Sequence, residues 1–141
     1  MSKEKTVLVC VTPQESSRDL VKAGRTIANQ SKVNLEVVSV LPVEKKENPI
    51  DPQTLEMIYA TAKEQGGEMA VYFSDDPTYT VIAHIAKRKP LTIVVGFPGA
   101  KSNNFISMIH LLLPETPISM VDKNGTVYNI LPQEKEINFK V

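Results

Sequence analysis

Residues 91–104 read LTIVVGFPGAKSNN, and this stretch decides the fold class. Its first half, LTIVVG, is a continuous apolar run rich in β-branched residues, which is typical of a strand covered on both faces. Its second half supplies glycines, a lysine and short polar side chains, which predict a loop leading into a helix near Asn103 or Asn104. A buried strand followed by such a loop is one β-to-α step of an α/β protein.

The same step recurs along the rest of the chain. Apolar runs predict four more strands, at residues 6–11, 35–43, 69–73 and 117–121. Apolar residues at helical spacing fill the intervals, and each interval is long enough for a crossover helix, which forces parallel pairing. The sequence therefore predicts an α/β fold with a doubly wound, five-stranded parallel sheet of order 3-2-1-4-5, flanked by helices.

Three local signals predict where helices begin. Asp51-Pro52 and Asp76-Pro77 are helix starts, because Asp accepts hydrogen bonds from the first free amides and Pro fits the first helical position. Ser16, with Asp19 three residues later, resembles a capping box at the start of the first helix.

The C-terminal end departs from the alternating pattern. Asn124-Gly125 between short apolar segments predicts a hairpin, and Ile137, Phe139 and Val141 alternate as in a strand. We therefore expect an α/β domain at residues 1–122, with residues 123–141 as a C-terminal antiparallel β extension of the same domain. The extension either covers the sheet edge or crosses to another subunit.

Composition excludes several classes of function. Sixteen basic and sixteen acidic side chains cancel, and 6% of residues are aromatic with no Trp, so neither nucleic-acid binding nor an anionic membrane surface is expected. No apolar run is long enough for membrane insertion. The lone Cys10 cannot form an internal disulfide, and no leader-like run follows Met1, so a cytoplasmic location is expected.

A ligand site is expected where the strand order reverses, between the carboxyl ends of the first and fourth strands. Gly96 and Gly99 let a ligand approach the backbone, and the free amides of the following helix favour an anion. A tight turn is an equally good interpretation of the two glycines, and a lysine such as Lys101 is most often a solvated surface charge. The predicted ligand-binding residues are Val11, Thr12, Pro13, Gln14, Val40, Gly96, Phe97, Gly99, Lys101, Ser102, Asn103 and Asn104.

Other reactive side chains predict no catalytic or metal site. His84 and His110 lack a second ligand at metal-binding spacing, so a structural role is expected for both. Cys10 lies within a buried strand, where a reactive thiolate is not expected. Ser16 and Ser17 have no evident base beside them.

Three segments resemble the universal stress protein family: residues 7–28 (VLVCVTPQESSRDLVKAGRTIA), 93–99 (IVVGFPG) and 116–121 (TPISMV). They are most similar to the family's variant in Kdp-type potassium-sensing histidine kinases. The resemblance covers roughly residues 5–122. It implies a five-stranded parallel sheet flanked by helices and a homodimer formed through the last strand.

The resemblance also implies which cofactors to consider. ATP-binding members have an Asp ending the first strand, a Gly-x-x-Gly after the fourth and then a Gly-Ser or Gly-Thr that holds phosphates. The matching positions here are Thr12, Gly96 with Gly99, and Ile109 with His110, so one of the three elements is kept. ATP, ADP and AMP are the candidate cofactors, but Ile109 argues against the family's usual ATP pose.

Some kinase-linked members bind cyclic di-AMP through a Ser-x-Ser and a Phe-Thr-Ala-x-Tyr motif. The corresponding residues here, 12–14 (TPQ) and 35–39 (LEVVS), lack both motifs, so this ligand is not predicted.

Three functions follow as hypotheses. The first is a universal-stress-protein-like regulatory module, a homodimer through strand 5 or the C-terminal extension, with a nucleotide or another small anion after the fourth strand. The second is a degenerate member that binds no ligand and acts as a dimerisation or interaction module. The resemblance to the kinase-linked variant implies a link to potassium transport or sensing. The third, a weak nucleotide hydrolase, has the least support, and we expect a protein that is not an enzyme.

Overall fold

The structure is a computed structural model that describes residues 5–12, 16–43, 51–97 and 104–131. Strands and helices alternate in it until the last hairpin. The elements are β1 (Thr6–Val11), α1 (Ser17–Ser31), β2 (Asn34–Leu41), α2 (Pro52–Glu64), β3 (Glu68–Phe73), α3 (Pro77–Arg88), β4 (Thr92–Gly96), α4 (Asn104–Leu112), β5 (Ile118–Val121) and β6 (Val127–Ile130).

The strands form one sheet in the order β3-β2-β1-β4-β5-β6. The first five pair in parallel and β6 pairs antiparallel to β5, so the predicted order and the antiparallel extension are confirmed. The hairpin between β5 and β6 contains Gly125 at φ +82°, a backbone angle that glycine adopts without strain. The strand pattern predicted from Ile137, Phe139 and Val141 lies outside the described residues.

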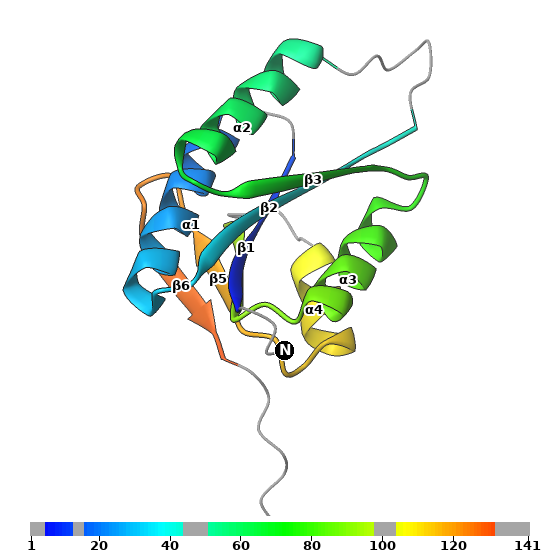
Figure 1. Ribbon diagram of the computed structural model, residues 1–141. Helices are drawn as coiled ribbons and strands as arrows, with labels where there is room; N and C mark the ends of the chain where they lie inside the picture. Colours follow the sequence, from blue (N-terminus) through cyan, green and yellow to red (C-terminus); the bar gives the residue numbers. More distant parts are fainter. Residues whose placement is uncertain (1–4, 13–15, 44–50, 98–103, 132–141) are drawn as a thin grey trace, which may run out of the picture.

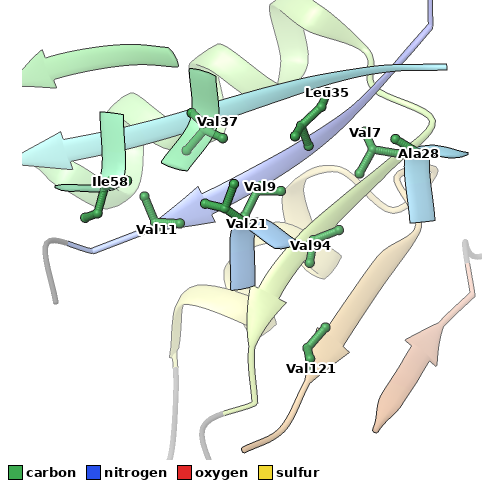
Figure 2. Close-up of a cluster of buried hydrophobic side chains, with 11 residues drawn as sticks. Val7, Val9, Val11, Val21, Ala28, Leu35, Val37, Ile58, Val94 and Val121 are labelled. Carbon is green, nitrogen blue, oxygen red and sulfur yellow. The ribbon is translucent and has the colours of Figure 1, made fainter. Parts of the chain in front are cut away.

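Helices cover both faces of the sheet (Figure 1). Side chains alternate between the faces along each strand, so neighbouring residues of β1 such as Val7 and Leu8 enter different cores. The α1/α2 face holds the cluster drawn in Figure 2, which includes Val9, Val37 and Ile58. The α3/α4 face holds the second core, with Ile85 and other aliphatic side chains. This double covering explains why the strands are continuous apolar runs.

The two Asp-Pro helix starts are confirmed. Asp51 accepts from the Gln53 amide at 3.0 Å, and Asp76 accepts from the Tyr79 amide at 3.1 Å. Hydrogen bonds from the Thr54 hydroxyl and the Gln53 amide hold the pKa of Asp51 below its ordinary value. The two helices that follow these caps, α2 and α3, pack on opposite faces of the sheet.

The predicted capping box at Ser16 is wrong. Ser16 adopts a helical backbone conformation and its side chain caps nothing. The Ser17 hydroxyl instead donates to the Thr12 carbonyl, which ties the start of α1 back to the end of β1.

Strand β2 is shorter than predicted at its carboxyl end. It stops at Leu41, because Pro42 has no amide hydrogen to donate, and Val43 is 45% exposed. Within the described ranges, no helix has the length and apolar character needed to span a bilayer.

Candidate functional site

The strand order reverses between β1 and β4, and there the two strands separate. Their pairing runs from Val7–Thr92 to Val9–Val94. Both strands continue for two more residues, to Val11 and Gly96. The carboxyl ends of these two strands therefore lie at the switch point of the sheet, where the sequence predicts a ligand site.

Gly96 ends β4 beside open space. No described atom lies within 4 Å of the position a Cβ would take, and the residue is exposed. Its φ lies outside the left-handed region, so backbone geometry does not demand glycine there. Neither packing among the described residues nor strain explains this glycine, whereas close approach by a ligand would.

Phe97, the next predicted contact, is turned toward the C-terminal hairpin. Its ring lies 5.1 Å from the ring of Tyr128 on β6, and its amide donates to the Val121 carbonyl at 2.9 Å. The ring remains 42% exposed. The hairpin thus fixes Phe97 at the β5 side of Gly96, away from β1.

Val11 and Val40 lie on opposite faces of the sheet. Val11 belongs to the α1/α2 core and Val40 to the α3/α4 core, and both side chains are buried. The structure therefore does not bring these two side chains together, and each is used for packing.

Thr12 follows β1 directly and is exposed, with its carbonyl accepting from Ser17. Asn104 is the first residue of α4, which agrees with the predicted helix start near Asn103 or Asn104. Six other predicted contacts lie outside the described residues: Pro13, Gln14, Gly99, Lys101, Ser102 and Asn103.

Ile109, at the position where the family pattern has glycine, is fully buried in the α3/α4 core. Its side chain is therefore part of the packing beneath α4. Ile109 also lies within α4, so a phosphate could reach its backbone only if the helix and that packing moved, which argues against the ATP pose that the family resemblance implies.

Ser39 is a polar residue that sequence reasoning missed. It is fully buried beside Val11, its partner in the β1–β2 register, and its hydroxyl has no hydrogen-bond partner among the described residues. A serine within the run LEVVSVL carries no signal that distinguishes it from a packing residue, so only the structure identifies this hydroxyl.

Cys10 has the chemistry of a packing residue. Its side chain contacts the α3/α4 core, and burial raises the pKa of the thiol to about 12. A thiol with such a pKa is not a thiolate near neutral pH. The described part of the chain also contains no group of three His, Cys, Asp or Glu residues that could hold a metal ion.

His84 has a more specific setting than the sequence indicates. Its Nε2 lies 2.7 Å from Glu36 Oε1, and its Nδ1 lies 2.7 Å from the Tyr72 hydroxyl. Arg88, one helical turn after His84, places Nη2 3.3 Å from the other oxygen of Glu36. These contacts fit the structural role expected for His84. The sequence did not predict the partners, because Glu36, Tyr72 and Arg88 lie in three separate elements and form no local motif.

Comparison with known proteins shows what this architecture is. No family model matches the sequence, and a search of curated proteins found no similar sequence. Among solved structures, a universal stress protein from Archaeoglobus fulgidus in complex with dAMP matches with a TM-score of 0.62 and 16% identity, over 84% of this chain and 98% of that chain.

Two further structures agree. A universal stress protein in complex with cAMP has a TM-score of 0.53 and 21% identity, over 79% of this chain and 83% of that chain. A universal stress protein family member from Burkholderia pseudomallei has a TM-score of 0.55 and 15% identity, over 86% of this chain and 98% of that chain. The chain therefore has the universal stress protein fold, and the resemblance stated from its motifs is confirmed at the level of fold.

Proposed function

We propose that this chain is a regulatory module that binds an adenine nucleotide, such as AMP, ADP or ATP, at the switch point beside Gly96. The observation that carries the proposal is the open space at Gly96, where β1 and β4 have separated. Two solved structures of the same fold contain adenine nucleotides, dAMP and cAMP. The proposed place of action is the cytoplasm.

The polarity of α4 supports an anionic ligand. This helix starts at Asn104, at the edge of the sheet where β4 ends. The first amides of a helix have no partners within it, and the helix dipole is positive at that end. A phosphate placed between Gly96 and the start of α4 would receive hydrogen bonds from the backbone. Such binding needs no glycine at position 109.

The proposed work is binding without covalent chemistry. A ligand that prefers one conformation shifts the population toward it and so changes the affinity for a partner. Among the described residues at the switch point, Thr12 and Gly96 offer hydrogen-bonding groups, and no nucleophile there has a base beside it. This favours a binding module over a nucleotide hydrolase.

The partner that fits best is a second copy of this chain, through β6. Both edges of β5 are occupied within the monomer, by β4 and by β6. The sequence predicts a homodimer through strand 5 or through the C-terminal extension. Because β6 of the extension is the outer strand, it is the one that can pair with another copy. Val127 and Tyr128 on it are 41% and 44% exposed, and an outer strand of this kind readily pairs with another.

The second hypothesis remains a non-binding dimerisation or interaction module, linked to potassium transport or sensing as the kinase-linked resemblance suggests. The buried Ile109 favours it, because that residue removes the family's phosphate turn. Nucleotide binding separates the two hypotheses.

The test is a thermal shift titration with ATP, ADP, AMP and cAMP, repeated by calorimetry. A nucleotide at about one hundred times its Kd adds about 2.7 kcal/mol to the free energy of unfolding. Gly96→Val should abolish this gain while leaving the unliganded protein as stable as before, since a Cβ there meets no described atom. Ala83→Val, at an exposed position of α3, is the matched control and should bind normally.

Retained binding in Gly96→Val would move the site elsewhere. No binding of any nucleotide to the unmodified protein would favour the interaction module, and steady release of phosphate from ATP would favour the hydrolase.

A further inference from the structure

A cavity lies at the amino ends of the strands, the end of the sheet opposite to Gly96. It has a volume of about 550 Å³ and lies between the first residues of β1, β2 and β3 and the end of α3. Its lining is mainly polar and includes four charged side chains. The lining residues are Thr6, Asn34, Leu35, Glu36, Gly66, Glu68, Lys87 and Arg88.

Glu36 is a buried carboxylate fixed in its orientation. Only 5% of the residue is exposed, on the α3/α4 face of β2. His84 holds Oε1 at 2.7 Å, and Tyr72 holds the far side of the His84 ring, also at 2.7 Å. The other oxygen, Oε2, lies 3.3 Å from Arg88, whose side chain is half exposed. Burying a carboxylate is unfavourable, so this degree of positioning is expected where the charge has a use.

A second carboxylate lies beside Glu36. Glu68 of β3 is its partner in the parallel register, so the two side chains point to the same face of the sheet. Like charges in adjacent positions of a sheet repel each other. Glu68 is exposed and forms no ion pair with any described residue. A cation between the two carboxylates would remove this repulsion, and an ammonium group has the donors to satisfy both.

Two cationic side chains complete the cavity. Lys87 and Arg88 occupy the last turn of α3 and face the same space as the two carboxylates. Arg88 already pairs with Glu36, whereas Glu68 and Lys87 form no ion pair with any described residue. An ion of one sign would match only one of these two side chains, and a molecule that carries both an ammonium and a carboxylate matches both.

We propose that this cavity binds a small zwitterion of the free amino acid class. Its ammonium lies between Glu36 and Glu68, and its carboxylate contacts Arg88 and Lys87. The end of α2 supports the position of the ammonium, because Gly66 just beyond that helix lines the cavity and the carbonyl end of a helix favours a positive group. The site is separate from the proposed nucleotide site, and neither proposal depends on the other.

The test is a ¹⁵N NMR titration of the full chain with each free L-amino acid at millimolar concentration. Cadaverine, which has only amines, and succinate, which has only carboxylates, are titrated in parallel. The expected result is saturable shifts of the Asn34, Gly66 and Glu68 amides with at least one amino acid, and none at Gly96. Cadaverine should bind at least about tenfold more weakly, and succinate should not bind.

Glu68→Gln tests the site without disturbing the buried network, because Glu68 is exposed. It should weaken amino acid binding about tenfold or more, the loss expected for one charge-assisted contact. Glu56→Gln, an exposed change on α2 away from the cavity, should leave affinity unchanged. The proposal is overturned if no amino acid shifts the cavity amides, if Glu68→Gln binds like the unmodified protein, or if cadaverine or succinate binds as tightly as the amino acids.

Discussion

His84 Nε2 lies 2.7 Å from Glu36 Oε1, and this contact joins the middle of α3 to the second strand of the sheet. Both side chains are buried, with 2% of the His84 side chain and 6% of the Glu36 side chain exposed. Tyr72 closes the arrangement on the other ring nitrogen. Three residues from three elements therefore share one hydrogen-bond chain, which runs from the buried Glu36 and His84 to Tyr72 at the surface.

Tyr72→Phe should lower the free energy of unfolding by about 1 to 3 kcal/mol, because it leaves a buried ring nitrogen of His84 without its partner. Urea unfolding monitored by circular dichroism measures the change. Tyr79→Phe is the control, since Tyr79 is 69% exposed and stands outside the chain of hydrogen bonds. Equal stabilities of the two variants would show that the Tyr72 hydroxyl contributes nothing.

Gly24→Ala should destabilise the protein by about 1 to 3 kcal/mol, the usual cost of forcing an extra methyl into a packed core. A Cβ at Gly24 would stand 2.3 Å from Cγ2 of Val9, where α1 crosses β1. Gly96→Ala is the matched change, because a Cβ there meets no described atom, and it should leave stability within about 0.5 kcal/mol. The reverse order of stabilities would contradict the packing described for α1.

Asp51→Ala should lower the melting temperature at pH 7, because it removes the acceptor for Gln53 and Thr54 at the start of α2. The pKa of Asp51 is lowered in the folded protein, so its stabilisation is present above the unfolded pKa of about 3.9 and is lost as the pH falls through the lower folded value. The gap in melting temperature between the variant and the unmodified protein should therefore close below pH 4. A gap that stays constant down to pH 2.5 would show that the charge of Asp51 plays no part.

Val127→Lys should convert the dimer proposed to form through β6 into a monomer, because a charge on an outer strand blocks pairing between sheets. Light scattering coupled to size exclusion measures the mass. Leu111→Lys is the control, since Leu111 is exposed on α4, away from β6. A dimer that survives Val127→Lys, but not Leu111→Lys, would place the interface on α4 instead.

The sequence predicted the central strands well because β1 and β4 are nearly unbroken apolar runs between residues that end strands or start helices. Val7 to Val9 and Ile93 to Val95 are buried, so their pattern depended on nothing outside the run. The end of β2 was misplaced because LPV continues the apolar pattern after Leu41, although Pro42 cannot donate to a neighbouring strand.

The site was predicted less completely, because its side chains depend on tertiary neighbours. Gly96 was found from its place after a strand, which follows from topology alone. The burial of Val11 and Val40 in opposite cores, and the stacking of Phe97 on Tyr128, follow from packing that no local pattern encodes. Nothing in the sequence around Glu36 indicates a buried carboxylate, because its partner His84 lies on a distant helix.

The most direct measurement of the central claim is a ¹⁵N NMR titration of the protein with AMP. Binding at the switch point predicts that the Thr12, Gly96 and Asn104 amides shift together, in a saturable way, while Gly66 and Glu68 at the opposite end of the sheet stay in place. Shifts confined to any other part of the chain, or no shift at millimolar AMP, ADP and ATP, would contradict it.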